Sequence, residues 1–569
     1  MEETTKKAAP NVHEQMEMVA RLGKSVTDQI EVYSKDPMKI QEEFLLQLIK
    51  SNAETEYGKT FGFSEINSIE DFRKKHPITT YDHYSEYIER EVNGEKNVLL
   101  ADTPVHFSKT SGTVGNPKKI PLNKKMVDIN LRIDTMHLMH MIAENCGYDI
   151  FKGRFFNLSE GTCTVLPSGA TLGSASALPK SNYSDSAFSD DSGSMFTSPV
   201  EASVPRKGTD TRYLHSRFAL MEPNVTLLIC TFSSFAYEIL RYIEKNWKVI
   251  VDDIENGTIS EQINIPDESR ETLMRKIKPM PERAAELRRI FSEGFETPFI
   301  PKVWPNMKCM LFVGGSTFAT YTDNIKRRYA GPEMQYCLQG INSSECKIST
   351  PYEMNNEDSM LIVEGAFFEF LPLDRETDRP LTLDEVEVGG QYEIMVTSSC
   401  GFYRYKMGDA VEVTGFYNKL PLIRFLYRVN QTVSITGEKT TEAMLRFSVS
   451  NACEELKLQL VDYSLYPDPD NLPMRYVFLV EVDSLPEGVT KEMLRDRIDK
   501  YLVTANPSMG AKIRDGICAP SGLELVQPQT YLLYRDIMSM KGISAAQLKP
   551  VNIIKNEFQR KFFFGLIER

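Results

Sequence analysis

Apolar side chains recur at helical spacing in three stretches of the N-terminal part of the chain. The first runs from His13 to about Tyr33, the second covers residues 44–49, and the third covers residues 123–143. A spacing of three or four residues places these side chains on one face of an α-helix. Asn123 has the side chain of a helix N-cap, so the third helix is expected to begin there.

Short apolar runs alternate with helical patterns further along the chain. Residues 225–230 and 310–313 have the pattern of buried strands, and residues 234–247 have the pattern of a helix that follows the first of them. Strands interleaved with helices are typical of an α/β architecture. We therefore expect an α/β fold in this part of the chain.

The pattern becomes β-rich from about residue 361. Residues 361–374, 391–399 and 409–417 look like strands separated by turns. Such a run of neighbouring strands favours a curled, β-rich segment appended to the α/β core.

The last 140 or so residues have a third pattern, in which helices and strands are mixed. We expect helices at 440–456 and 491–502, a strand at 475–482 and an extended stretch at 526–535. At roughly 100–200 residues per domain, a chain of 569 residues is too long for one core. The patterns predict two domains, which are a large α/β N-terminal domain of several subdomains (1–428) and a smaller α+β C-terminal domain (429–569).

Composition and charge exclude several classes of function. The formal net charge is −13, so a nucleic-acid-coating surface is not expected. The N-terminus lacks the pattern of a secretory signal, and no apolar run reaches the ~18 residues that span a bilayer. The nine cysteines are scattered and form no C-x-x-C pair, which is typical of reduced thiols in a cytoplasmic protein.

One stretch has the composition of a phosphate-binding loop. Residues 108–119 read SKTSGTVGNPKK and combine hydroxyls, two glycines and two lysines between an extended segment and the helix at Asn123. Glycines let the backbone approach a phosphate, and hydroxyl and N–H groups can donate to its oxygens. A plain surface turn has the same composition, so the pattern alone leaves both readings open.

Two further features are less specific. Residues 181–198 are rich in Ser, Asp and Gly, which predicts a loop. His137 and His140 stand three residues apart and could share a metal, although core histidines are the more common interpretation. The last histidine is His215, so any chemistry in the distal half must rest on lysine, arginine, carboxylate and hydroxyl groups.

The order of motifs gives a more specific indication. TSGTVGNPKK is similar to the phosphate loop of the adenylate-forming superfamily, and the chain as a whole resembles the Gretchen Hagen 3 family of acyl acid amido synthetases. The resemblance extends over about residues 46–549 and rests on eight ordered landmarks, which are NAETEYGKTFGF, PITTYDHYSEYIER, VWPNMKCMLFVGGS, SSEC, GAFFEFLP, FYRYKMGDAVEVTGFYN, SITGEKTTEA and SAAQLKP.

The resemblance implies an enzyme, a carbon–nitrogen ligase that uses ATP and Mg²⁺. A carboxylic acid would first become an acyl-adenylate, and an amine, commonly an amino acid, would then take the acyl group. The residues that the resemblance assigns to the nucleotide are Ser111, Gly112 and Thr113 for the β- and γ-phosphates, Asn342, Ser343, Ser344 and Glu345 for the α-phosphate and Mg²⁺, Asp409 for the ribose, Arg428 at the hinge and Lys549 for the α-phosphate. Lys439 would be a second cation, used during amide formation. The resemblance also implies that the smaller C-terminal domain is mobile.

The acid is less well defined than the reaction. Arg132, Met136 and Lys347 are expected near it, and Lys347 stands where plant members of the family often carry an aromatic residue. Ile341 stands where relatives keep a tyrosine that lies on the adenine. Two other functions stay open, which are an acyl-CoA synthetase and a non-catalytic protein that binds a nucleotide or a small acid.

Overall fold

The structure is a computed structural model, and it describes residues 11–109, 118–174, 194–375, 377, 379–429, 432–541 and 543–568. The expectations for Ser111, Gly112 and Thr113 lie outside these residues. The predicted loop at 181–198 is described only from residue 194 onward, so most of it also lies outside them.

The chain divides into two compact units. Unit 1 comprises Met1–Gly314, Tyr321–Met407 and Val411–Arg424. Unit 2 comprises Gly315–Thr320, Gly408–Ala410 and Phe425–Arg569. Each unit has hydrophobic cores of its own, as is typical of separately packed domains.

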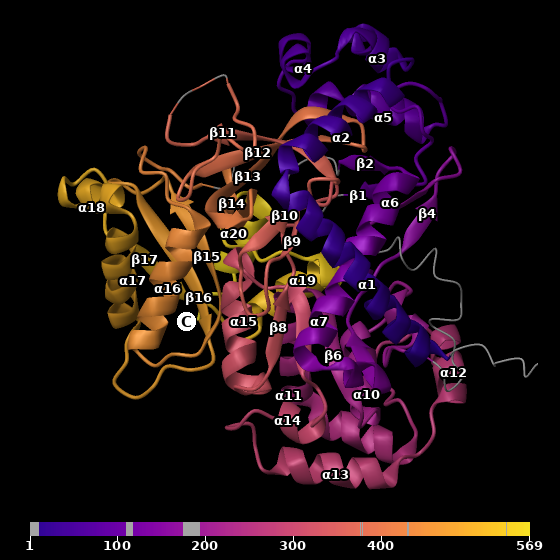
Figure 1. Ribbon diagram of the computed structural model, residues 1–569. Coiled ribbons are helices and arrows are strands. Elements are labelled where there is room, and N and C mark those ends of the chain that lie inside the picture. Colours follow the sequence, from indigo (N-terminus) through magenta and orange to yellow (C-terminus); the bar gives the residue numbers. More distant parts are fainter. Residues whose placement is uncertain are drawn as a thin grey trace, which may run out of the picture. The chain divides into compact units, whose positions relative to one another are not determined.

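The first helix of unit 1, α1, begins with a capping box. The Asn11 side chain accepts the N–H of Glu14, and the Glu14 carboxylate accepts the N–H of Asn11, both at 3.0 Å. The helices expected at 13–33 and 44–49 are confirmed and extend further at both ends. The first helices, indigo in Figure 1, are α1 (Val12–Lys35), α2 (Pro37–Ser51), α3 (Glu56–Thr60), α4 (Ile69–Lys75) and α5 (Ser85–Val92).

The helix expected at 123–143 forms, but it contains a wide turn. Asn123 caps it as expected, because its side chain accepts the Met126 N–H at 3.0 Å. Gly23 of α1 lies against the wide turn, where a Cβ on Gly23 would be 2.0 Å from the Met136 carbonyl oxygen. The run consists of α6 (Lys124–Asn130), the π-helical segment η3 (Leu131–His137) and α7 (Leu138–Cys146). Segments of this kind are rare and often occur at functional sites.

A parallel sheet forms the α/β core of unit 1. Its strand order is β3-β6-β7-β8, and the strands are β3 (Arg154–Asn157), β6 (Val225–Phe232), β7 (Cys309–Val313) and β8 (Gln335–Leu338). Helices α10 (Thr211–Met221), α11 (Ser233–Asn256) and α13 (Pro281–Ser292) belong to the same part of the chain (Figure 1). The strands expected at 225–230 and 310–313 and the helix expected at 234–247 are confirmed.

A small mixed sheet brackets the predicted phosphate loop. Its order is β2-β1-β5-β4, with strands β1 (His106–Lys109), β2 (Lys119–Leu122), β4 (Cys163–Val165) and β5 (Thr171–Gly173). β1 and β2 pair antiparallel, so that Lys109 stands opposite Lys119. Both of these lysines belong to the described residues.

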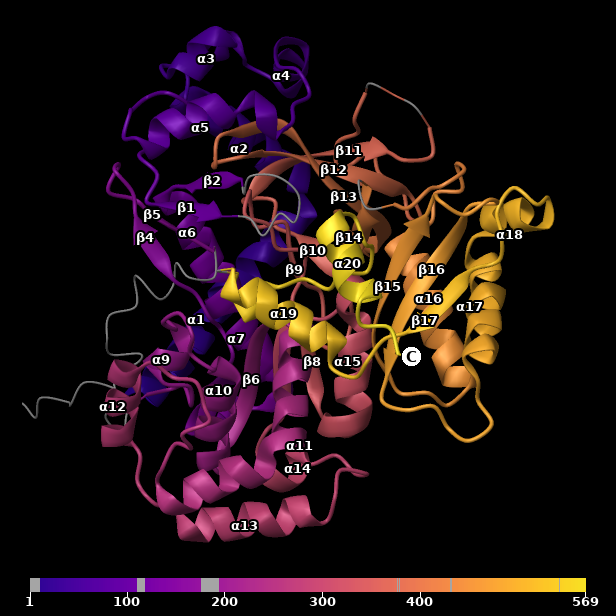
Figure 2. The ribbon, with the colours of Figure 1, turned by 180° about the vertical axis from the view of Figure 1, so that it is seen from behind.

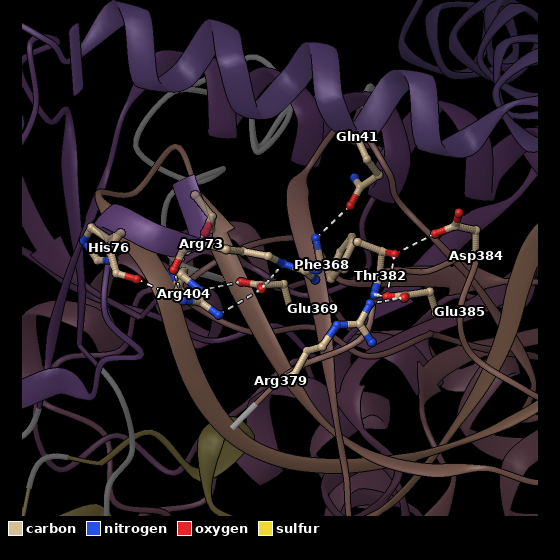
Figure 3. Close-up of polar contacts among 11 residues, drawn as sticks. Gln41, Arg73, His76, Phe368, Glu369, Arg379, Thr382, Asp384, Glu385 and Arg404 are labelled. Carbon is tan, nitrogen blue, oxygen red and sulfur yellow. Dashed lines mark hydrogen bonds and ion pairs between the residues drawn. The ribbon is translucent and has the colours of Figure 1, made fainter. Parts of the chain in front are cut away.

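The β-rich segment forms a six-stranded sheet in the order β11-β12-β13-β14-β10-β9. Its edge strand β11 is covered by α2, because Gln41 donates to the carbonyls of Val363 and Ala366 at 2.6 Å and accepts the Phe368 N–H at 2.7 Å (Figure 3). The strands are β9 (Ser349–Pro351), β10 (Ser359–Leu361), β11 (Ala366–Pro372), β12 (Gln391–Ser398), β13 (Phe402–Tyr417) and β14 (Leu420–Arg428).

Unit 2 is an α+β domain built on the sheet β15-β16-β17. The helices expected at 440–456 and 491–502 and the strand expected at 475–482 are confirmed. Its main elements, orange to yellow in Figure 2, are β15 (Leu460–Asp468), β16 (Arg475–Val482), β17 (Gly522–Leu525), α16 (Glu442–Glu455), α17 (Lys491–Ala505), α18 (Pro507–Arg514), α19 (Thr530–Met540) and α20 (Glu557–Phe564).

The prediction of an extended stretch at 526–535 is wrong, because most of these residues lie in the helix α19 (Thr530–Met540). Aromatic residues favour strands by propensity, but Tyr531 and Tyr534 are three residues apart and share a helical face. Their rings lie 4.9 and 5.2 Å from the ring of Phe563 in α20. Burial of this aromatic face decides the local structure.

Unit 1 contains a buried carboxyl group whose protonation affects stability. Glu91 accepts the N–H groups of Leu99 and Leu100 with one oxygen, at 3.1 and 2.8 Å, while its other oxygen has no hydrogen-bond partner. Burial raises the pKa of Glu91 to about 7. The folded state therefore binds more protons than the unfolded state between about pH 4.3 and pH 7, and stability falls as pH rises through this window.

Glu91→Gln is expected to stabilise the protein at pH 8, by at most about 3 kcal/mol, and to have a smaller effect at pH 5.5. The amide keeps the acceptor oxygen and removes the buried charge. Thermal unfolding at the two pH values measures the difference. An equal shift at both pH values would contradict the assigned protonation.

Among the described residues, no helix has the length and apolarity needed to cross a bilayer.

Candidate functional site

A tight turn between β8 and β9 holds Glu345. The Ser343 hydroxyl donates to the Cys346 carbonyl at 2.9 Å and accepts the Cys346 N–H at 3.1 Å. Ser349 closes the turn through its hydroxyl, which accepts the Ile341 N–H at 2.7 Å. Glu345 is 9% exposed, whereas Ser344 before it is only partly buried. The turn thus buries the carboxylate beside a more accessible serine.

The Tyr405 hydroxyl lies between Glu345 and a lysine of the predicted phosphate loop. It receives a hydrogen bond from Lys118 Nζ at 2.9 Å and donates to Glu345 Oε1 at 3.5 Å. The Lys118 ammonium also lies 5.2 Å from the centre of the Tyr81 ring. Unit 1 therefore brings a cation from the end of the loop and a buried carboxylate to one hydroxyl group.

The two lysines at the end of the loop have different surroundings. Lys119 Nζ binds the Glu89 carboxylate at 2.8 Å on the surface, and the backbone of Lys119 exchanges two hydrogen bonds with the Tyr81 hydroxyl. Lys118 instead approaches the Tyr405 hydroxyl. Lys118 is therefore the lysine of this pair that faces Glu345.

A second polar network connects the Glu345 turn to the π-helical segment η3. The side chain of Lys347 is 2% exposed and pairs with the Asp134 carboxylate and the Asn342 side-chain oxygen. Arg132 of the same segment pairs with Glu364 at 3.3 Å. Met136 packs partly buried against the large core of unit 1. The structure thus brings Asn342, Lys347 and η3 together.

In unit 2, Asp409 forms a salt bridge with Arg428. Asp409 is 3% exposed and follows Gly408, whose φ of +73° suits glycine. Arg428 Nε lies 3.0 Å from Asp409 Oδ1, and the Arg428 side chain is 46% exposed. These two predicted nucleotide residues therefore contact each other within one unit.

Lys549 lies in a cluster of charged groups around Glu442. Glu442 is 9% exposed, and its Oε2 accepts the Thr317 hydroxyl at 2.9 Å. Burial raises the pKa of Glu442, against the opposing effects of Thr317, Lys555 and Lys549. Both lysines are exposed and lie near enough to Glu442 to stabilise its charged form. Lys549 is thus an exposed residue that lies near a buried carboxylate.

Lys439 stands on a loop of unit 2 that hydrogen bonds close. Its φ is +49°, and it is exposed between buried Glu438 and Thr440. Glu438 accepts the N–H groups of Ile435 and Thr436, both at 2.8 Å, and the loop is closed by hydrogen bonds between Val433 and Thr440. These hydrogen bonds support the backbone on both sides of Lys439.

No group of three or more histidine, cysteine or carboxylate side chains is arranged to hold a metal ion in the described part of the chain. The two histidines considered for a shared metal lie in a helical core instead. His137 is 2% exposed and bonds to the Thr27 hydroxyl at 2.9 Å, and burial lowers its pKa to about 4. The core interpretation of His137 and His140 is favoured.

Sequence reasoning missed several residues of these clusters. Tyr405 and Glu442 stood within recognised motifs but received no role, and Lys118 was named only as one of two lysines that add charge to the predicted phosphate loop. Tyr405 and Lys118 are 287 positions apart. Their contact depends on β13 lying near the small mixed sheet, which no local pattern encodes.

The fold matches that of a solved structure of an amido synthetase. A solved structure described as the GH3.15 acyl acid amido synthetase superposes on this chain with a TM-score of 0.82, 23% identity and coverage of 96% of each chain. At this identity the likeness shows the fold, and it confirms the α/β class with a large N-terminal and a smaller C-terminal domain.

The chain belongs to the GH3 family. Models of the GH3 family N-terminal, central and C-terminal domains match residues 26–334, 359–428 and 443–557. Two curated relatives from Arabidopsis thaliana are an indole-3-acetic acid-amido synthetase, GH3.4 (29% identical, covering 91% of this chain and 90% of the relative), and a 4-substituted benzoates-glutamate ligase, GH3.12 (27%, 95% and 97%). The family predicted from the sequence, and with it a carbon–nitrogen ligase, is confirmed.

Proposed function

We propose that this protein is an ATP-dependent acyl acid amido synthetase that works in two half-reactions. In the first, a carboxylate oxygen attacks the α-phosphorus of ATP, the bond to the β-phosphate oxygen breaks, and pyrophosphate leaves. In the second, an amine nitrogen attacks the acyl carbonyl, loses a proton and displaces AMP. An amino acid is the proposed amine, in keeping with the names of the relatives.

The observation that carries the proposal is the contact of Lys118 and Glu345 with one hydroxyl group, that of Tyr405. A carboxylate must approach an anionic triphosphate, so local positive charge is required. At an effective dielectric constant of about 20, two unit charges about 4 Å apart interact by roughly 4 kcal/mol. Lys118 supplies such a charge, and Glu345 can hold a cation.

The residues of unit 1 fit a magnesium ion that is bound mainly by substrate oxygens. Mg²⁺ commonly uses one or two carboxylates together with phosphates and water. Glu345 offers one buried carboxylate, and Ser344 next to it is accessible to steady the α-phosphate. When bound, the ion would neutralise phosphate charge. Glu345 would orient it, and Asn342 and Ser343 would shape the turn that holds Glu345.

The other assigned residues have supporting roles. Ser111, Gly112 and Thr113 are proposed to cradle the β- and γ-phosphates, as their hydroxyl and N–H groups allow. Asp409, held by Arg428, is proposed to accept the ribose hydroxyls. Lys549 is proposed to stabilise charge on the α-phosphate, and Lys439 to assist amide formation.

The acid is proposed to carry a polar group besides its reacting carboxylate. Lys347 is buried and paired with Asp134 and Asn342, which makes this part of unit 1 polar. Arg132 and Met136 lie on the same η3 segment as Asp134. A polar network around a buried lysine favours a ligand that can hydrogen-bond to it over a purely apolar one.

The compartment proposed for this protein is the cytoplasm. All nine cysteines are free, and eight of them are buried. This agrees with the scattered cysteine pattern of the sequence.

The function is tested with a panel of carboxylic acids. We expect acid-dependent exchange of labelled pyrophosphate into ATP, and amide conjugates by mass spectrometry when amino acids are added. Acids with a polar substituent should react better than apolar acids of equal size. Thioester formation with coenzyme A and no amide would favour the acyl-CoA synthetase, and nucleotide binding without exchange would favour the non-catalytic protein.

A further inference from the structure

Arg404 has a strained backbone conformation inside strand β13. Its φ is +47°, in the left-handed region that residues other than glycine seldom adopt. Such conformations persist only where the surrounding structure holds them, and they cluster at functional sites. Arg404 directly precedes Tyr405, whose hydroxyl contacts Lys118 and Glu345.

The Arg404 guanidinium is anchored by a buried ion pair (Figure 3). Its Nε and Nη2 donate to the two oxygens of Glu369 at 3.1 and 3.3 Å. Its Nη1 donates to the carbonyls of His76 and Arg73 at 2.9 and 3.1 Å. Glu369 lies on β11, is 1% exposed, and also accepts Arg73 Nε at 3.0 Å. The side chain of Arg404 is thus fixed by two separate parts of unit 1.

The backbone on both sides of Tyr405 is also held by hydrogen bonds. The Arg404 N–H donates to the Thr397 hydroxyl at 2.9 Å. Thr79 donates its N–H to the Arg404 carbonyl and accepts the Lys406 N–H, both at 3.0 Å, so that its two bonds bracket Tyr405. These contacts set the direction in which the Tyr405 side chain leaves the strand.

We propose that the Arg404–Glu369 ion pair is a positioning device that holds Tyr405 where its hydroxyl keeps Lys118 and Glu345 in place for MgATP. The pair acts through Tyr405 and does not touch the nucleotide itself. This inference rests on the proposed function, since it assigns Lys118 and Glu345 to MgATP.

The test is the affinity for MgATP, measured by isothermal titration calorimetry, which needs no knowledge of the acid. Arg404→Gln and Tyr405→Phe are each expected to weaken binding about 10-fold. Because the first acts through the second, the double variant should lose about the same 10-fold and not about 100-fold. The loss of affinity should be smaller when ATP is titrated in EDTA, which removes Mg²⁺. Glu345 is proposed to act on the nucleotide through Mg²⁺, so its position should matter less without the ion.

Arg73→Gln is the matched control. It removes another partner of Glu369 but leaves the side-chain contacts of Arg404 with Glu369 intact, so MgATP affinity should change less than about 2-fold. Where Arg404→Gln does not fold, Glu369→Gln on β11 can replace it in the comparison with Tyr405→Phe. The glutamine amide keeps one acceptor oxygen for Arg404.

Four results overturn the inference. Losses that multiply in the double variant would show that the pair does not act through Tyr405. Losses equal with and without Mg²⁺, or equal in the Arg73 control, would show a general structural role. Wild-type protein that binds no MgATP would remove the proposed function itself, whereas the first three results would leave the proposed function standing.

Discussion

Lys549→Ala is expected to slow acyl-adenylate formation about 10²–10³-fold, because Lys549 is the cation proposed to stabilise the charge that develops on the α-phosphate. The proposed role is electrostatic stabilisation of the transition state, so the rate should fall more than the affinity for MgATP. Lys549 is exposed, and its loss should not unfold the chain. Acid-dependent pyrophosphate exchange measures the rate, and calorimetry measures the affinity.

Lys439→Ala is the matched control for Lys549. Both lysines are exposed residues of unit 2, and the proposal places them in different half-reactions. The Lys439 variant should keep pyrophosphate exchange and lose amide formation from the adenylate. Wild-type exchange in the Lys549 variant would remove that lysine from the mechanism.

Glu369→Ala is expected to lower the free energy of unfolding by about 3–5 kcal/mol, because it leaves the buried guanidinium of Arg404 and the partly buried one of Arg73 without their shared carboxylate. Arg404 and Arg73 both donate to Glu369, at 3.0–3.3 Å. The strained backbone of Arg404, itself worth about 1–3 kcal/mol, would also lose its main anchor. Chemical denaturation followed by circular dichroism measures the change.

Arg379→Ala provides the comparison for this stability test. Arg379 pairs with Glu385 near the same sheet (Figure 3), but its side chain is 66% exposed. Exposed pairs contribute about 0–1 kcal/mol, so this variant should unfold almost as the wild type does. A loss in Glu369→Ala no larger than that in Arg379→Ala would show that burial does not strengthen the first pair.

Most helices and strands could be predicted from the sequence because their apolar residues repeat at one clear spacing. The strand at 225–230 and the helix at 234–247 are examples, since both bury a continuous face. The helix α19 could not be predicted in this way. Its tyrosines favour a strand locally, and their partner Phe563 comes 29 or more residues later in the chain.

The motif residues Glu345, Asp409 and Lys549 could be named from the sequence because motifs preserve chemistry at fixed spacing. Their surroundings could not. Glu442, the carboxylate near Lys549, and Tyr405, the hydroxyl that joins Lys118 to Glu345, act through contacts between distant segments. Such contacts depend on how strands and helices pack, and no local pattern records them.

The wide turn at Leu131–His137 also affects how this chain is aligned with others. A π-helical turn accommodates one extra residue, and each residue of an α-helix rotates the next side chain by about 100°. A helical wheel drawn without interruption from Asn123 to Cys146 would therefore put the residues beyond the turn on the wrong side. An alignment with a relative that lacks the extra residue should carry its gap inside this helix and not in a neighbouring loop.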